Sequence, residues 1–345
     1  MDKKFITVNI GSSSKRYALF QEKSLISSQH FENEDSRSYY AFKTFVNSLK
    51  DSSYIKDEEE IDAIGMRIVA PGEFFSHHRV IDSDFLKHLI NIEKSDIAHI
   101  TPVLQELKRI KEIFPRTKII GASDSAFHST MPDFVKNYAI PKELASKSGV
   151  YKFGFHGLSI ASILHSLERK NNKIDSRIII CHLGNGASIT AVKDGKSIDT
   201  SMGYSPLDGL VMSSRVGSID VGAIICLSET ESIENLQNIF YTKSGLLALS
   251  GVSSDMRILV EKEREGHKGA HTAIEAFIYN VKKYIGAYAG ILGGVDTIVF
   301  SGAIGENSVP VRERVLQGLE YLKANIQIIP SEESQEIIRI LKRNL

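Results

Sequence analysis

The feature that most constrains the fold is a unit that occurs twice: an apolar strand, a glycine-rich turn with small polar residues, and a returning strand. Residues 5–20 read FITVNI, GSSSK and RYALF, and residues 177–193 read RIIICHL, GNGAS and ITAVKDG. Apolar, β-branched runs bounded by glycine and serine are typical of strands. Two hairpins can arise independently, so the repeat is weak by itself. Each turn places backbone N–H groups and hydroxyls at a strand end, where they could hold phosphate.

Helical and strand patterns alternate along the rest of the chain. We expect helices around 83–112, after Gly157 and around 268–290, and a strand at 117–121. A third strand-plus-glycine unit, VDTIVFSGAIGENS at 295–308, precedes a helical pattern that begins near Val309, with Pro310 suited to a first helical turn. Strands interleaved with helices indicate an α/β protein. The polar, acidic residues 31–60 are expected to form solvent-exposed loop and helix surface.

Composition narrows the functional classes. The chain has 345 residues, 42% of them hydrophobic, a length that favours two domains, and residues 141–149 (PKELASKSG) are the best candidate boundary. Lys plus Arg (42) balances Asp plus Glu (42), so no overall field attracts nucleic acid or anionic membrane. No run reaches the roughly 18 apolar residues of a membrane span. We therefore expect a cytoplasmic protein with neither nucleic acid nor membrane as partner.

Two common site types are unsupported by the sequence. Neither G-x-x-x-x-G-K-[ST] nor a strand-linked G-x-G-x-x-G occurs, so phosphate, if bound, is bound by other means. Cys181 and Cys226 lack metal-ligand spacing, and Cys181 lies in an apolar run that predicts a small buried thiol.

Seven segments resemble motifs of the acetate kinases, the acetokinase family of short-chain acyl kinases, in the family order. They are NIGSSSKRYALF, MRIVAPGE, SDSAFHSTMP, YKFGFHGLS, HLGNGASITAVKDGKSIDTSMGYSPLDGLVMSSRVGSID, SGLLALSGVSSDMR and FSGAIGEN. The resemblance covers most of the chain. It implies two related actin-like (ribonuclease H-like) α/β domains around an interdomain cleft, of the actin-like and sugar-kinase superfamily. Residues 1–146 with 329–345 would form one domain, and 147–328 the nucleotide-binding domain.

The implied reaction is reversible: ATP phosphorylates acetate to acetyl phosphate by direct in-line transfer. Such a transfer needs positioned reactants and cationic donors more than covalent chemistry. By resemblance, Arg67 and Arg215 bind the carboxylate and the transferring phosphoryl group, which a guanidinium grips with two parallel hydrogen bonds. Both arginines are expected in apolar or glycine-rich loops. His156 would contact the phosphoryl group in the transition state, and Asp124, at a strand end, would orient the reacting groups or the arginine.

The resemblance also implies the remaining site residues and partners. Mg²⁺, with Mn²⁺ as an alternative, would lie near Asn9 and Glu333, with Glu332 as the rival for the second position. The acyl pocket would use Val69, Phe155 and Pro206, and His128 is interpreted as structural. A homodimer is expected. The implied contacts of ATP and ADP are Ser14, Lys15, His182, Leu183, Gly184, Asn185, Gly186, Asp255, Met256, Arg257, Gly302, Ala303, Ile304 and Asn307, with Ser12 beside them in the first turn.

The chain departs from the family pattern at the substrate loop. The usual His-Gly-Gly-Glu run appears as Ala70-Pro71-Gly72-Glu73, and Pro71 removes an amide donor. His99 lies near a position where an apolar residue is expected. Three alternatives therefore stay open: a propionate or other short-chain acyl kinase, a non-enzymatic nucleotide-binding module, and a phosphatase or chaperone-like ATPase that hydrolyses ATP without an acid.

Overall fold

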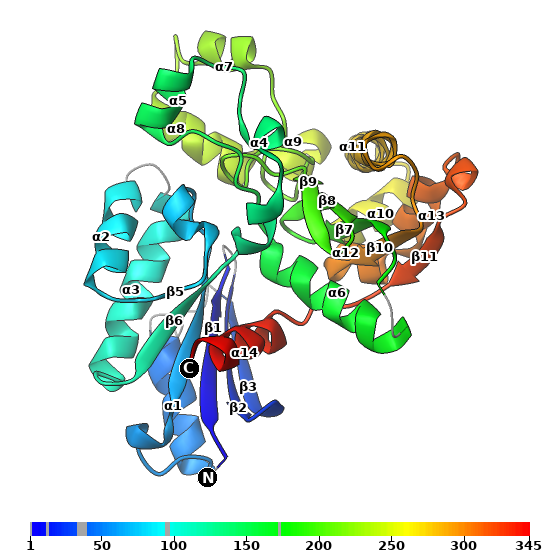
Figure 1. Ribbon diagram of the computed structural model, residues 1–345. Coiled ribbons are helices and arrows are strands. Elements are labelled where there is room, and N and C mark those ends of the chain that lie inside the picture. The colour runs from blue at the N-terminus through cyan, green and yellow to red at the C-terminus, as the bar shows by residue number, and fades with distance from the viewer. Residues whose placement is uncertain (1, 12–13, 33–39, 94–96, 172–173) are drawn as a thin grey trace. The chain divides into compact units, whose positions relative to one another are not determined.

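The computed structural model describes residues 2–11, 14–32, 40–93, 97–171 and 174–345 (Figure 1). The chain divides into two compact units, which are described separately: unit 1 is Met1–Ala126 with Glu332–Leu345, and unit 2 is Phe127–Ser331. Each unit contains one mixed sheet and several helices, which confirms the α/β class. The domain limits expected from the sequence, at 146/147 and 328/329, stay a prediction.

The sheet of unit 1 has six strands in the order β3-β2-β1-β4-β6-β5. The pairs β1–β2, β2–β3 and β5–β6 are antiparallel, and β1–β4 and β4–β6 are parallel. The expected hairpin at 5–20 and the strand at 117–121 are both present. The strands are β1 Lys4–Ile10, β2 Ser14–Gln21, β3 Ser24–Glu32, β4 Ala63–Ile68, β5 Arg79–Val80 and β6 Lys118–Ser123.

Helices cover both faces of this sheet. The helical elements of unit 1 are α1 Ala41–Asp51, α2 Ser83–Ile92, α3 Ile97–Ile113 and α14 Glu333–Asn344, with short 3-10 turns at Glu58–Glu60 and Glu73–Ser76. The predicted helix at 83–112 is thus two helices. Ile64 and Met66 of β4 pack in the core that α1, α2 and α3 share. Because successive residues of a strand face opposite sides of the sheet, Gly65 lies on the other face. An added Cβ at Gly65 would overlap Ile337, so its small size lets α14 lie directly on the sheet.

The expectation that residues 31–60 are solvent-exposed is wrong for α1. Ala41, Phe42, Phe45, Val46 and Leu49 of this helix are all buried. Their spacing of one, three and four residues places them on one face of the helix. The polar residues between them make the average composition of the segment polar, so this apolar face was not recognised from composition. The helix therefore contributes to the core rather than to a solvated surface.

The sheet of unit 2 repeats the pairing pattern of unit 1. Its order is β11-β10-β7-β8-β9. The hairpin pairs β7–β8 and β8–β9 are antiparallel, and β7–β10 and β10–β11 are parallel. The first strand of each hairpin thus has the returning strand on one side and a parallel strand on the other. The repeat seen in the sequence is therefore a repeat of topology. The strands are β7 Arg177–Leu183, β8 Ala187–Lys193, β9 Lys196–Thr200, β10 Thr297–Ser301 and β11 Asn325–Ile328.

Two long helices pack on this second sheet. The helix α6 (Gly157–Asn171) shares a core with Ile178 and Ile180 of β7, and α11 (Lys268–Leu292) also packs on β7 and β8. Both helices were expected. The other helical elements are 3-10 turns at Ala126–Thr130 and Glu320–Leu322, a π-helix at Ile239–Lys243, and α4 Asp133–Lys136, α5 Lys142–Ser148, α7 Val221–Leu227, α8 Ile233–Asn238, α9 Gly245–Ser250, α10 Met256–Arg264, α12 Gly302–Asn307 and α13 Val309–Leu316.

The segment after β10 differs from the expectation in one respect. A helix does begin at Val309 with Pro310 in its first turn, as predicted. Residues 302–307, the glycine-containing end of the unit at 295–308, already form the short helix α12, so the strand passes directly into helix. Among the described residues, no helix is long and apolar enough to cross a membrane.

Candidate active site

The candidate site residues of unit 1 are centred on an arginine–aspartate pair. Arg67 lies on β4 and is paired in register with Ala122 of β6, and Asp124 follows the end of β6. The Nη2 atom of Arg67 lies 2.8 Å from Oδ2 of Asp124, which is completely buried. The expectation that Arg67 lies in a loop is wrong, because the hydrophobic residues around it continue the strand. The expectation that Asp124 lies at a strand end is confirmed.

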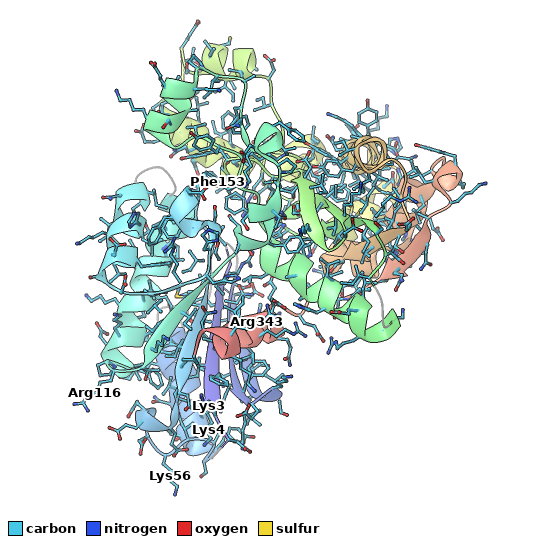
Figure 2. The ribbon with its side chains drawn as sticks, viewed as in Figure 1. Lys3, Lys4, Lys56, Arg116, Phe153 and Arg343 are labelled. Carbon is cyan, nitrogen blue, oxygen red and sulfur yellow. The ribbon has the colours of Figure 1, made fainter. Side chains whose placement is uncertain are left out.

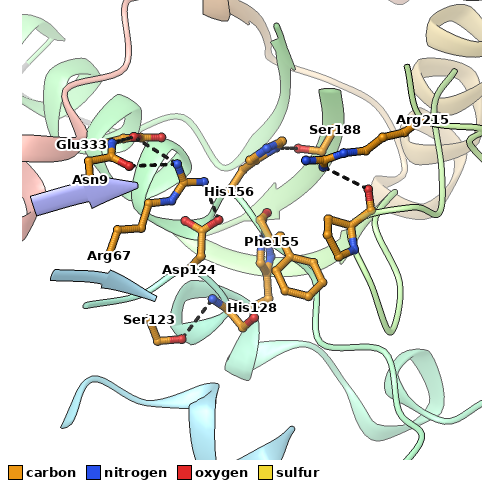
Figure 3. A network of polar contacts seen from close by, with 12 residues as sticks. Asn9, Arg67, Ser123, Asp124, His128, Phe155, His156, Ser188, Arg215 and Glu333 are labelled. Carbon is orange, nitrogen blue, oxygen red and sulfur yellow. Dashed lines mark hydrogen bonds and ion pairs between the residues drawn. The ribbon is translucent and has the colours of Figure 1, made fainter. Parts of the chain in front are cut away.

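Asn9 and Glu333 hold the other side of the same guanidinium. Alternation along β1 and β4 places Asn9 and Arg67 on the sheet face that α14 covers, and Glu333 is the first residue of α14. The Nη1 atom of Arg67 donates to Oδ1 of Asn9 at 3.3 Å and lies 3.5 Å from Oε2 of Glu333. Asn9 also donates from Nδ2 to Glu333. Figure 3 shows Arg67 with Asp124 on one side and Asn9 and Glu333 on the other.

These contacts keep Arg67 charged. Burial by itself disfavours the cation and lowers its pKa, but the carboxylates of Asp124 and Glu333 outweigh burial, so the pKa of Arg67 is raised. The geometry also decides between Glu333 and Glu332 as the partner of Asn9. Glu333 makes that contact, whereas Glu332 occupies the N-cap position of α14 without a capping side-chain hydrogen bond.

The donor set of unit 1 suits Mg²⁺ only in part. No group of three or more His, Cys, Asp or Glu side chains in the described part of the chain could hold a metal ion by itself. Mg²⁺, however, usually keeps several waters and takes one or two carboxylates together with substrate phosphates. The carboxylate of Glu333 and the amide oxygen of Asn9 are hard oxygen ligands of this kind. The residues therefore fit a metal ion that arrives with a nucleotide.

Lys15 forms an ion pair with Glu106, a residue that was not predicted from the sequence. Lys15 lies on β2 and is 8% exposed, and its Nζ atom is 3.2 Å from Oε2 of the fully buried Glu106 on α3. Glu106 also accepts hydrogen bonds from the hydroxyl of Tyr17 at 2.7 Å and from Arg109 at 2.9 Å. Burial, then the charge of Glu106, raises the pKa of Tyr17, so the phenol stays a donor. Nothing in the sequence distinguishes Glu106 from Glu112, the exposed acid of the same helix. Ser14 begins β2, and Ser12 lies outside the described residues.

The candidate site residues of unit 2 form a separate cluster that begins at His156. This residue directly precedes α6 and has a left-handed φ of +63°. Its Nδ1 atom lies 3.0 Å from Oγ of Ser188 on β8. Its ring meets the ring of His182 edge to face, with centroids 4.8 Å apart. His182 is placed there by the alternation along β7, which carries Ile178, Ile180 and His182 to the α6 side of the sheet.

Arg215 meets His156 at the GNG turn. An ideal Cβ built on Gly186 would lie 3.2 Å from Nε2 of His156 and 3.6 Å from Nη1 of Arg215. The Nη1 atom also donates to the carbonyl of Pro206 at 3.4 Å, and the guanidinium lies 5.9 Å from the ring centroid of Tyr241. The turn therefore has a histidine and an arginine against a backbone that carries no side chain at that point. Figure 3 shows His156 in contact with Ser188, with the side chain of Arg215 nearby.

The predicted nucleotide residues fall into two groups. The GNG turn (Gly184–Gly186) and the start of α12 are adjacent, since a Cβ on Gly184 would lie 3.9 Å from the amide nitrogen of Ala303. Leu183 belongs to the same cluster, with its carbonyl oxygen against Gly302. Ile304 is buried in α12, and Asn307 donates to the carbonyl of Ala303 at 2.9 Å.

The second group is at the start of α10. Asp255 caps this helix by accepting from the amide of Arg257 at 2.8 Å. The side chain of Arg257 is 90% exposed and pairs with Asp255 at 2.6 Å, while Met256 is buried. Within the described residues, the side chains of Asp255 and Arg257 form ion pairs only with each other. The structure thus leaves the Arg257 guanidinium at the surface.

The predicted acyl-pocket residues are distributed over both units. Val69, which follows β4, is partly buried in unit 1, while Phe155 and Pro206 are buried in unit 2. His128 is fully buried and bonds the carbonyl of Phe155 and the hydroxyl of Ser197, each at 2.9 Å, which agrees with a structural role.

The altered substrate loop has a defined conformation. Ala70 and Pro71 are buried, and Gly72, with a φ of +117°, leads into the 3-10 turn at Glu73–Ser76. His99 falls in α3, but its side chain lies outside the described part. Cys181 is buried, as predicted, and burial raises the pKa of its thiol.

Comparison with known proteins identifies the family. The model of the acetokinase family matches residues 27–336. An acetate kinase from Thermoanaerobacterium thermosaccharolyticum is 38% identical over 97% of both chains, and one from Bacillus subtilis is 40% identical over 92% of this chain and 88% of that protein. Among solved structures, Porphyromonas gingivalis acetate kinase matches with a TM-score of 0.85 at 30% identity, covering 99% of both chains. A propionate kinase from Francisella tularensis matches with a TM-score of 0.87 at 30% identity, covering 98% of both. The chain belongs to the acetokinase family.

Proposed function

We propose that this chain transfers the γ-phosphoryl group of ATP directly to the carboxylate of acetate, reversibly, with acetyl phosphate and ADP as products. The observation that carries the proposal is the arrangement in unit 2, where His156 and Arg215 meet at the GNG turn. A histidine donor and a guanidinium against bare backbone suit a group whose charge spreads over equatorial oxygens. Family membership supports the same reaction.

The proposal gives a separate role to each of two arginines. Arg215 stabilises the transferring phosphoryl group, and Arg67 binds the acetate carboxylate. Asp124 orients Arg67, because a buried carboxylate 2.8 Å from Nη2 restricts the rotation of the guanidinium. Positioning of this kind lowers the barrier by removing rotational freedom before the reaction.

A divalent cation completes the proposed site. Asn9 and Glu333 would hold Mg²⁺, or Mn²⁺ in its place, through their oxygens, which fit a hard ion with few protein ligands. When bound with the nucleotide, the ion would neutralise charge on the phosphate oxygens. Glu333 serves two partners in this scheme, the ion and Arg67, so metal binding and carboxylate binding are linked through one side chain.

The nucleotide is proposed to bind through unit 2. The backbone of Gly184–Gly186 and of Gly302–Ala303 offers amide donors to the phosphates, with His182 and Asn185 beside them. Ile304, Asn307, Asp255, Met256 and Arg257 are proposed to surround adenosine. Ser14 and Lys15 are proposed as further phosphate contacts, although the Lys15 ammonium is paired with Glu106 in this structure.

A second acyl substrate has specific support. The chain resembles a propionate kinase of known structure as closely as it resembles the acetate kinases of known structure. One further buried methylene is worth about 0.8 kcal/mol, which changes affinity only about fourfold. We propose acetate as the main acceptor and propionate as an accepted analogue at Val69, Phe155 and Pro206.

The protein is further proposed to be a cytoplasmic homodimer. Three apolar side chains near α7 and α8 are largely exposed: Val221 at 68%, Ile225 at 61% and Ile233 at 59%. A second copy of the chain would remove such side chains from water. Sedimentation of the native chain and of Ile225→Asp tests this: a dimer that the substitution weakens is expected, and an unchanged monomer contradicts it.

The reaction is tested by trapping acyl phosphate with hydroxylamine in the presence of ATP, Mg²⁺ and a panel of short carboxylic acids. Arg67→Ala and Arg215→Ala are each expected to lower turnover by several orders of magnitude, equivalent to about 3 kcal/mol or more of lost stabilisation. Arg116→Ala and Arg264→Ala are matched controls, since both arginines are exposed and Arg116 points away from its unit in Figure 2. ATP hydrolysis independent of acid, or full activity in the first two variants, would reject the proposal.

A further inference from the structure

A buried serine next to the proposed active histidine has no role in the scheme above. Ser188 lies on β8, is completely buried, and is paired in register with His182 of β7. Directly paired residues of neighbouring strands project from the same face of a sheet. Ser188 and His182 therefore both face the side from which His156 packs, and the ring of His156 contacts both of them.

The hydroxyl of Ser188 makes a single hydrogen bond among the described residues, to Nδ1 of His156 at 3.0 Å. A serine hydroxyl has one proton to donate, and a neutral imidazole accepts at one nitrogen and donates at the other. If Nδ1 carried the proton, the hydroxyl would accept and its own proton would be buried without a partner. A buried hydroxyl proton without an acceptor is unfavourable, because it has lost its hydrogen bond to water. If the hydroxyl donates to Nδ1 instead, both groups are satisfied.

The second arrangement fixes the other nitrogen of the ring. With Nδ1 as acceptor, the proton of the neutral imidazole is on Nε2. That atom lies against Gly186, where Nη1 of Arg215 also lies. The backbone of His156 is itself in an uncommon conformation, left-handed at a φ of +63°, which few non-glycine residues adopt. The Ser188 hydroxyl therefore favours one tautomer, and it adds to the contact with His182 that orients the ring.

We infer that Ser188 is a positioning residue that holds His156 as the Nε2–H tautomer, so that the ring presents an N–H donor beside Arg215. This inference rests on the proposed function for its catalytic meaning, because the donor would act on the transferring phosphoryl group. Its structural content, the tautomer, does not depend on which substrate is used. Ser188 itself touches no substrate in this account.

The tautomer is measured directly by long-range proton–nitrogen NMR on protein labelled at histidine, with the His156 signals identified by their loss in His156→Gln. Native protein is expected to show the Nε2–H form, and Ser188→Ala a mixture of both forms. Thr190→Val is the matched control: Thr190 is equally buried two residues along the same strand, but its hydroxyl bonds Thr200 at 3.1 Å. An Nδ1–H form in native protein would overturn the inference, whether or not any variant folds.

Kinetics supply the second readout. Ser188→Ala is expected to lower kcat about tenfold, less than the loss expected for removing a direct donor, while the KM values for ATP and acetate stay within about twofold. Ser188→Thr, which restores the hydroxyl, is expected to recover most of kcat, and Thr190→Val to keep it. An unchanged kcat in Ser188→Ala would overturn the inference. Native protein that forms no acyl phosphate yet shows the Nε2–H tautomer would reject the proposed function alone.

Discussion

Asp124 accepts a hydrogen bond from Nη2 of Arg67 at 2.8 Å at a position that is completely closed to solvent. A buried carboxylate of this kind is stable only with a partner of opposite charge. Arg67 in turn keeps its proton because of the charges around it. The two groups therefore act as one unit, in which the aspartate sets the direction of the guanidinium.

Asp124→Asn keeps the size of the side chain and removes its charge. We expect kcat for acyl phosphate formation to fall about 100- to 1,000-fold, because Arg67 loses its fixed orientation. Steady-state kinetics with varied acetate measure this. Asp51→Asn, at an exposed aspartate with no ion pair among the described contacts, is the control and should retain native kcat. A loss under threefold in Asp124→Asn would remove Asp124 from the site.

Glu106 is expected to dominate the stability of unit 1. It is completely buried and has Lys15, Arg109 and Tyr17 as partners. Removing one member of a buried charged cluster leaves the others uncompensated and typically costs about 3–5 kcal/mol. Glu106→Gln should therefore lower the free energy of unfolding in urea by several kcal/mol. Glu112→Gln, at an exposed position of the same helix, should change it by less than about 0.5 kcal/mol.

His78 should make stability depend on pH. Burial lowers its pKa to about 4, an effect that His77 and Arg343 reinforce and Glu336 opposes. Its Nδ1 atom accepts from the amide of Ser123 at 3.1 Å, which requires a neutral ring. In the unfolded chain the imidazole of His78 binds a proton below about pH 6.5, whereas in the folded state protonation is unfavourable until a lower pH. Stability is expected to be unaffected above that pH, and to fall by roughly 3 kcal/mol as the pH drops to about 4.

Thermal or urea unfolding across this pH range measures the effect. His78→Asn, whose side-chain oxygen can take the place of Nδ1, should flatten this part of the pH dependence. His88→Asn, at a histidine that is 42% exposed, should leave it unchanged. The same slope in His78→Asn as in the native protein would show that another group is responsible.

Local patterns in the sequence predicted the elements of the fold well, and packing decided the rest. Both hairpins follow from apolar, β-branched runs separated by glycine turns, and α6 and α11 follow from helical patterns in the sequence. The buried face of α1 was missed because the average composition of residues 31–60 is polar, which hides the apolar residues that recur on one face of the helix. The helix α12 was missed because three of its first five positions are glycine or alanine, which are equally common in loops.

The residues of the candidate site were predicted mainly from the resemblance to the acetate kinase family. The contacts that orient these residues were not predicted. Arg67, Asp124, Asn9 and Glu333 do meet, although Glu333 is far from the others in the chain. Glu106 and Ser188 were overlooked for a physical reason. Their importance comes from burial beside a charged or titratable partner on another element, which only tertiary packing creates.

Gly302 provides a test of how tightly the GNG turn and α12 approach each other. It has a left-handed φ of +76°, and an added Cβ would lie 2.6 Å from the carbonyl oxygen of Leu183. Gly302→Ala should therefore suffer both backbone strain, about 1–2 kcal/mol, and an overlap with backbone that cannot move aside. Gly266, at a φ of +85° with nothing within 4 Å, is the matched control, since alanine there meets the strain alone. In urea unfolding, Gly302→Ala should lose at least 1 kcal/mol more than Gly266→Ala. Equal losses would mean that the turn has room to shift away from α12.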